Sequence, residues 1–166
     1  MTQTPKTLSP TQLAAYFAFT EVGSLVRHAV EQQLRDAGDL SYVQFQLLAT
    51  LGDAPGGVRR MTDLADGLVY SRSGLTYQAQ LLERRGLVTR APSPEDERST
   101  LVTLTADGRA VLAQVFPGHI KAVQTLLFGA LADDDVEDLA RIMGKAAGHL
   151  RSAPPRSATP RRRKAP

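Results

Sequence analysis

Apolar side chains in the first half of the chain recur at spacings of three and four residues, the pattern of helices that bury one face. The four helices that this pattern predicts span residues 10–37, 41–51, 63–68 and 71–85. Ser41, with Gln44 three positions later, forms a capping-box pattern. Thr62 and Ser71 are suited to cap the third and fourth helices, and Gly86 is suited to end the fourth in a left-handed conformation.

The pattern changes after the fourth helix. Residues 87–90 and 100–104 are β-prone, and the polar segment 91–99 between them contains two prolines, which predicts a hairpin with a long tip. Helical periodicity then returns, and the two remaining helices span residues 106–128 and 133–151. The expected fold class is therefore mainly α, with a small β wing of two or three strands attached to a helix-turn-helix.

The predicted fourth helix has two contrasting faces. Leu75, Ala79 and Leu82 recur at positions i, i+4 and i+7 and are expected to pack on the third helix. The opposite face is rich in hydrogen-bonding groups and carries no acid; it consists of Arg72, Ser73, Thr76, Tyr77 and Gln80. A helix that enters the major groove of DNA needs donors and acceptors for base edges and no carboxylate that faces the phosphates.

The two ends of that helix and the hairpin extend the predicted interface. Ser71 lies at the end expected to sit deepest in the groove, and Arg84 lies at the far end, where a phosphate contact is expected. Arg98 lies at or near the hairpin tip, where it can enter the minor groove, with its guanidinium held by Asp96. The predicted DNA-binding residues are Ser71, Arg72, Ser73, Thr76, Tyr77, Gln80, Arg84, Asp96 and Arg98. A helix and hairpin that serve only as scaffold remain the alternative.

The net charge of the chain is weaker evidence for DNA binding than its total value suggests. The 166 residues include 20 basic and 17 acidic side chains, a formal charge of +3, but six of the basic residues lie between residue 151 and the end. The remaining 14 bases against 17 acids give −3 for residues 1–150. The Pro- and Arg-rich tail, residues 152–166, is expected to be disordered, and either phosphate contacts or simple solvation would account for its charge.

Several motifs of this chain resemble the MarR family of bacterial winged helix-turn-helix transcription regulators. The stretches that carry the resemblance are Met61–Asp66, Ser71–Thr76, Leu82–Val88, Asp96–Ser99 and Val102–Thr105. The resemblance implies a homodimer that binds a pseudo-palindromic operator in double-stranded DNA, acting as a ligand-responsive repressor. Many members carry arginine at the position of Tyr77, so bidentate recognition of guanine from that position is lost here.

The same resemblance suggests the domain organisation. We expect a flexible N-terminus over residues 1–9 and a single MarR-like domain over residues 10–151. Within the domain, residues 41–105 form the winged helix-turn-helix, and residues 10–37 and 106–151 supply dimerisation helices. No apolar run approaches the length of a membrane span and no secretory signal is recognisable, so the expected location is cytoplasmic and nucleoid-associated, without a membrane partner.

Small-molecule and metal sites are less clearly indicated. Many MarR-like proteins respond to small aromatic or lipophilic effectors, and Tyr16, Phe17, Tyr42 and Phe45 are the candidates to line such a cavity. No cofactor, metal or enzymatic activity is expected, because the chain has no cysteine, its three histidines are scattered, and no nucleophile lies in a catalytic context. Two alternatives remain open: a winged-helix protein-interaction module without DNA binding, and a metal-responsive repressor.

Overall fold

The computed structural model describes residues 7–68 and 70–152, apart from the side chain of Glu97. In chain order the elements are α1 (Pro10–Gly38), α2 (Tyr42–Gly52), η1 (Pro55–Gly57), β1 (Val58–Arg60), α3 (Met61–Gly67), α4 (Arg72–Arg84), β2 (Val88–Ser93), β3 (Asp96–Leu104), α5 (Ala106–Val123), η2 (Gln124–Phe128) and α6 (Asp133–Arg151). Most of the expected flexible N-terminus, residues 1–6, and nearly all of the expected disordered tail, residues 153–166, lie outside the described residues.

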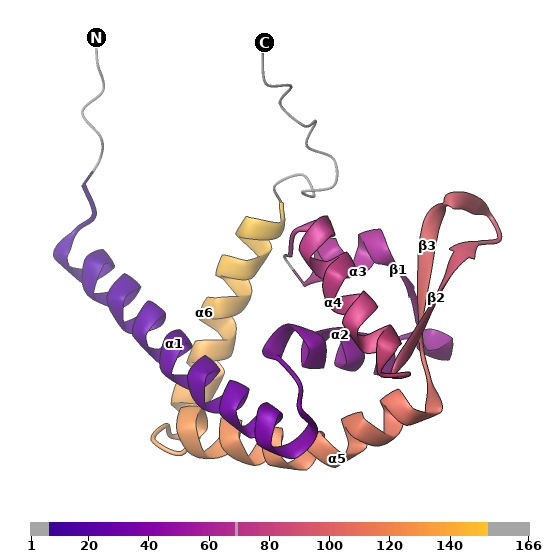
Figure 1. Ribbon diagram of the computed structural model, residues 1–166. Coiled ribbons are helices and arrows are strands. Elements are labelled where there is room, and N and C mark those ends of the chain that lie inside the picture. Colours follow the sequence, from indigo (N-terminus) through magenta and orange to yellow (C-terminus); the bar gives the residue numbers. More distant parts are fainter. Residues whose placement is uncertain (1–6, 69, 153–166) are drawn as a thin grey trace, which may run out of the picture.

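The elements form two groups (Figure 1). The long helices α1 and α6 lie on one side, and α2, α3, α4 and the sheet form a compact unit on the other, with α5 running beneath both. The predicted fold class, mainly α with a small β wing, is confirmed. No single helix among the described residues is long and apolar enough to cross a membrane; the one pair that passes the same test jointly, Ala106–Phe128 with Asp133–Arg151, is bent by 99°.

Capping residues explain most of the helix boundaries. The Ser41–Gln44 capping box is present, with each side chain bonded to the other residue's backbone N–H, and the Ser71 hydroxyl accepts from Gly74. The predicted cap at Thr62 is wrong: α3 begins two residues earlier than predicted, Arg60 occupies the cap position, and Thr62 lies inside the helix. Strand β1, which the sequence did not predict, runs directly into α3, and no side-chain cap is present there.

The sheet has three antiparallel strands in the order β1-β3-β2. The wing is longer and its tip shorter than expected, because β2 and β3 pair as far as Ser93 and Asp96. Pro92 is tolerated because β2 is an edge strand, and the register shifts next to it. Strand pairing therefore absorbs most of the segment predicted to be a loop, and Arg98 lies in β3 rather than in a flexible tip.

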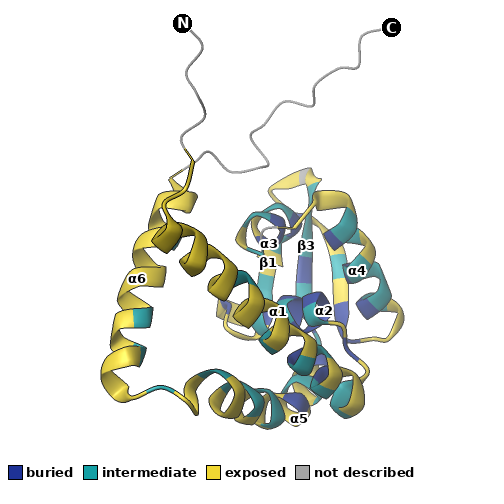
Figure 2. Ribbon diagram, turned by 90° about the vertical axis from the view of Figure 1, so that its left-hand side faces the viewer, coloured by how far each residue is buried: buried dark blue, intermediate teal, exposed yellow. Residues whose placement is uncertain are grey.

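The core lies between α2, α3, α4 and the sheet, with the C-terminal third of α1 and part of α5 closing it. Its largest fully buried side chains are Leu34, Leu40, Leu47, Leu48, Leu51, Leu64, Leu75, Leu82, Val30, Val88, Val102 and Val115. In contrast, α6 has no buried residue, and the N-terminal half of α1 is exposed along its length. Figure 2 shows this division: most of the buried positions lie in the helix-turn-helix unit, and α1 and α6 are largely exposed.

Candidate nucleic-acid interface

The second helix of the helix-turn-helix, α4, buries the predicted stripe. Leu75, Ala79 and Leu82 are each 0% exposed. On α3, Leu64 and Ala65 are buried in the same core. The division of α4 into an apolar and a polar face is therefore confirmed, and its polar residues are left on the outer side.

The polar face of α4 is accessible over its first two turns. Arg72, Ser73 and Tyr77 are exposed, and Thr76 and Gln80 are half-buried. The Thr76 hydroxyl donates to the carbonyl of Arg72 at 2.7 Å, which leaves its oxygen lone pairs directed outward as acceptors. Tyr77 is 54% exposed, so its ring and hydroxyl project from the protein surface. The face thus offers several donors and acceptors on one rigid helix.

The wing presents Arg98 in a different way from that expected. Arg98 is exposed and is the third residue of β3, the second strand of the hairpin, three positions after the last residue of the tip. The Asp96 carboxylate accepts a hydrogen bond from the backbone N–H of Arg98 at 3.0 Å, and among the described residues no ion pair joins it to the guanidinium. The expectation that Asp96 holds the guanidinium is therefore wrong: a carboxylate two residues earlier reaches the local N–H and stabilises the hairpin end instead.

Two acids near this surface, Glu83 and Glu95, are paired with arginines. Glu83, the first acid of α4, receives three hydrogen bonds from Arg90 of β2, two from the guanidinium at 2.7 and 2.9 Å and one from the backbone N–H at 3.1 Å. Glu95 at the tip pairs with Arg60 of β1. Both pairs reduce the negative potential of the wing, and the first one also joins the wing rigidly to α4.

The two arginines at the end of α4 differ. Arg84 is exposed, and a side chain must be exposed to reach a phosphate. Arg85 instead donates to the backbone carbonyls of Asp39 and Gly38, at 2.6 and 2.9 Å. The sequence could not predict the Arg85 contact, because a partner 46 residues away leaves no local signal.

A cavity of about 640 Å³ lies between α1, the end of α5, η2, α6 and the start of α2. Its wall is mostly apolar and consists of Ala15, Ala18, Phe19, Val22, Gly23, Val26, Arg27, Val30, Tyr42, His119, Val123, Leu127, Leu139 and Met143. Of the four residues predicted to line an effector cavity, only Tyr42 does so. Phe45 is buried in the core, and Tyr16 and Phe17 are more than half exposed and lie outside this wall.

Two polar groups interrupt the apolar wall. The guanidinium of Arg27 lies 5.2 Å from the centre of the Tyr42 ring. His119 packs on the Phe45 ring at 4.5 Å, its Nδ1 is buried without a hydrogen-bond partner, and burial lowers the pKa of its imidazole. The imidazole is therefore neutral near pH 7, with an unsatisfied polar atom beside the cavity. Nothing in the sequence distinguished His119 from the other two histidines.

Metal ligation has less support. In the part of the chain that the structure describes, no group of three or more His, Asp or Glu side chains is arranged to hold a metal ion. Asp133, Asp134 and Asp135 occupy the first turn of α6, where the Asp135 carboxylate accepts from the backbone N–H of Ala132. Their placement is explained by the helix dipole and the cap.

Comparison with known proteins decides the family. The chain is similar to Sco3205 from Streptomyces coelicolor, a MarR family transcriptional regulator solved in complex with DNA, with 30% sequence identity and a TM-score of 0.83; the match covers 90% of this chain and 93% of that one. The chain belongs to the MarR family of transcription regulators. The MarR family sequence model also matches residues 38–99.

Two further MarR-type proteins agree. AbsC, a MarR family regulator from Streptomyces coelicolor, is 29% identical with a TM-score of 0.82, covering 89% of this chain and 99% of that one. YetL, an HTH-type transcriptional repressor from Bacillus subtilis, is 26% identical over 132 residues, 80% of this chain and 78% of that protein. The likeness therefore extends well beyond the helix-turn-helix to α1, α5 and α6.

Proposed function

We propose that this MarR family member binds double-stranded DNA sequence-specifically, as a homodimer on a pseudo-palindromic operator, and represses transcription in the cytoplasm, on the nucleoid. The observation that carries the proposal is the acid-free face of α4 beside an exposed wing arginine. The similarity to Sco3205, solved with DNA, and to the repressor YetL supports it. The proposal includes no catalytic step.

The polar residues divide by position. Ser73, Thr76, Tyr77 and Gln80 are assigned to base edges, since they lie on the outer face of α4. Ser71 and Arg72 lie at the end of α4 that we assign to the deepest part of the groove, and Arg84 is assigned to a phosphate at the far end. Arg98 is assigned to the minor groove, and Asp96 acts only indirectly, by stabilising the hairpin end that presents it.

The wing contact provides the direct test. Arg98→Ala is expected to weaken operator binding by about 1–3 kcal/mol, because a specific groove contact is lost. The operator is first recovered by in vitro selection from random duplexes with the unmodified chain, and affinities are then measured by fluorescence anisotropy. Arg35→Ala, which removes an exposed arginine near the C-terminal end of α1 that is hydrogen-bonded to Gln32, is the control and should bind as the unmodified chain does.

Three results would count against this reading. Unchanged affinity in Arg98→Ala removes the wing contact from the interface. If the unmodified chain selects no duplex at any salt concentration, DNA binding itself is wrong, and a protein-interaction module becomes the better interpretation. If operator affinity changes with added zinc or nickel and the change is reversed by a chelator, the protein is a metal-responsive repressor instead.

We further propose a small aromatic or lipophilic effector for the cavity between α1 and α6. Its volume suits such a molecule, and so does its mostly apolar wall, which is interrupted by Arg27 and His119. An effector there would contact both α1 and Tyr42 of α2, and so both sides of the turn that precedes the helix-turn-helix.

Filling the cavity tests the effector proposal. Gly23 lies in the cavity wall, and a Cβ placed there meets nothing within 4 Å. The leucine side chain of Gly23→Leu therefore occupies part of the cavity and reduces the space left for an effector. In a panel of phenols and aromatic acids, the compounds that lower operator affinity of the unmodified chain are expected to have no effect on Gly23→Leu, whose affinity without effector stays the same. An equal response in both proteins would place the effector elsewhere.

A further inference from the structure

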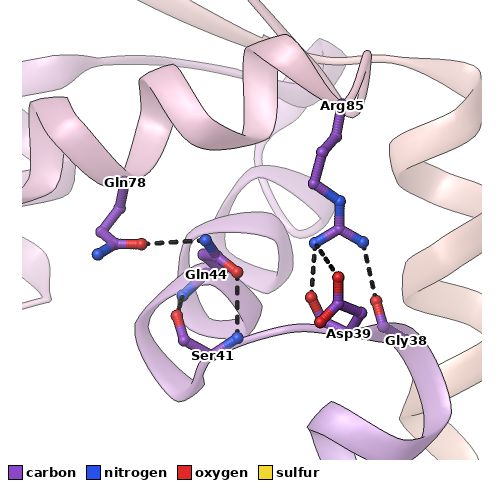
Figure 3. A network of polar contacts seen from close by, with 6 residues as sticks. All are labelled: Gly38, Asp39, Ser41, Gln44, Gln78 and Arg85. Carbon is purple, nitrogen blue, oxygen red and sulfur yellow. Dashed lines mark hydrogen bonds and ion pairs between the residues drawn. The ribbon is translucent and has the colours of Figure 1, made fainter.

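A polar network joins α4 to the end of α1 and to the first turn of α2 (Figure 3). At one point the Arg85 guanidinium donates to the carbonyls of Gly38 and Asp39. At a second point the Gln44 amide donates to Oε1 of Gln78 at 3.0 Å. Both contacts leave α4 on the side away from the proposed DNA-binding face.

The first contact completes the end of α1. The last carbonyls of a helix have no partner within it, and Asp39 turns the chain sharply with φ of 50°, which leaves the carbonyls of Gly38 and Asp39 pointing out of the helix. The planar fork of Arg85 matches two such carbonyls at once, and the Asp39 carboxylate lies 4.0 Å away. A residue at the C-terminal cap of α4 thus also caps α1.

The second contact is held equally firmly. Gln44 is 8% exposed, and its Oε1 is already occupied by the backbone N–H of Ser41 in the capping box. Its amide nitrogen is therefore oriented before Gln78 meets it. While this bond is made, Gln78 is not available for a base contact. Its role therefore differs from that of the neighbouring Tyr77, which is assigned to a base edge.

The spacing of the two contacts fixes an angle as well as a position. Gln78 and Arg85 are seven residues apart, about 10 Å along the helix axis. A single attachment would let α4 pivot about one point. One attachment to the end of α1 and a second to the first turn of α2 together define the direction of α4 relative to the α1–α2 corner. The buried residues Leu75, Ala79 and Leu82 set how closely α4 packs against the core.

From this geometry we infer that Arg85, assisted by Gln78, is a positioning residue that sets the spacing between half-sites that the dimer recognises. The inference rests on the proposed function. If α1 lies at the dimer interface, the angle between α1 and α4 determines how far apart the two α4 helices stand. Each base pair inserted between half-sites moves one of them by about 3.4 Å and rotates it by about a tenth of a turn.

The test measures spacing preference rather than affinity alone. The selected operator is altered by −2 to +2 base pairs at its centre, and each duplex is titrated at several salt concentrations with the unmodified chain, Arg85→Ala, Arg85→Lys and Gln78→Met. The unmodified chain is expected to prefer its own spacing by at least about tenfold per inserted base pair, the discrimination that one mismatched pair gives. Arg85→Ala is expected to reduce that preference to about threefold or less with an unchanged salt slope. Arg85→Lys is expected to be intermediate, because an ammonium group reaches only one carbonyl well.

Arg84→Ala is the matched control. Loss of this exposed neighbour should weaken binding equally at every spacing and reduce the salt slope by about 1. The same behaviour in Arg85→Ala would overturn the inference, since Arg85 would then be a phosphate contact. An unchanged spacing preference in Arg85→Ala or in Gln78→Met would overturn it too.

Two observations distinguish a failure of the inference from misfolding of a variant and from a failure of DNA binding. Circular dichroism and thermal unfolding of each variant show whether it folds, and Arg85→Lys and Gln78→Met provide independent readings if Arg85→Ala does not. If the unmodified chain binds no duplex, the proposed function fails, and the inference fails with it. If it binds and the variants keep its spacing preference, only the inference fails.

Discussion

Gly108→Ala is expected to lower the free energy of unfolding by about 3 kcal/mol, because the site has no room for a methyl group. A Cβ at this position would lie 2.1 Å from the carbonyl oxygen of Leu87 and 2.6 Å from Cδ1 of Leu104. The first of these atoms belongs to the backbone, which cannot rotate away as a flexible side chain would.

The neighbouring contacts prevent the joint from opening. The carbonyl of Leu87 accepts from the backbone N–H of Thr105 at 3.2 Å, and the Thr105 hydroxyl donates to the carbonyl of Gly86 at 2.7 Å. The same hydroxyl accepts from the N–H of Gly108 and so caps α5. A methyl group would therefore separate the first turn of α5 from the end of α4 and the start of the wing.

Thermal unfolding of the two proteins at one fixed concentration measures the effect. A loss of about 3 kcal/mol corresponds to a fall of about 6–12 °C in Tm for a chain of this size. Gly67→Ala is the matched control: no atom lies within 4 Å of a Cβ at Gly67, and its φ is not positive, so its Tm should be unchanged or slightly higher. A Gly108→Ala protein as stable as the unmodified chain would show that the joint is not tightly packed.

Features with a local cause could be predicted from the sequence. The caps at Ser41 and Ser71 depend on residues three positions apart, and the left-handed Gly86, with φ of 72°, depends on one residue type. The buried stripe of α4 follows from helical periodicity alone. In each case the physical cause lies within a few residues of the element that it determines.

Features with a distant cause could not be predicted. Strand β1 has only three residues, too few for an alternating pattern, and it exists because it pairs with Leu101–Thr103 more than 40 residues later. The partner of Arg85 lies 46 residues away. The cavity wall was missed for the same reason: residue type selected Tyr16 and Phe17, but the packing of α5 and α6 decides which face of α1 is enclosed, and that face carries Phe19, Val22 and Val26.

Leu25→Asp is expected to separate the proposed homodimer and to lower operator affinity by at least about 100-fold. The N-terminal half of α1 and the whole of α6 expose large apolar side chains that the described chain leaves uncovered, among them Leu13, Phe17, Phe19, Leu25, Ile142 and Leu150. An apolar surface of this extent is characteristic of an interface between subunits. Leu25 itself is 65% exposed, so an aspartate there costs the single chain little and would be buried only against a partner.

The size of the effect follows from the linkage of two half-sites. A dimer that binds one half-site places its second α4 beside the other at a high effective concentration, which raises overall affinity by about 10²–10⁴ over a single subunit. Sedimentation velocity should therefore find Leu25→Asp monomeric, with an unchanged helical circular dichroism spectrum, while anisotropy shows the loss of operator binding. Ala106→Asp adds the same charge to an exposed residue at the start of α5 and should remain dimeric. A Leu25→Asp protein that stays dimeric and binds its operator normally would move the dimer interface away from α1, and the geometric role of Arg85 would then need a different reference helix.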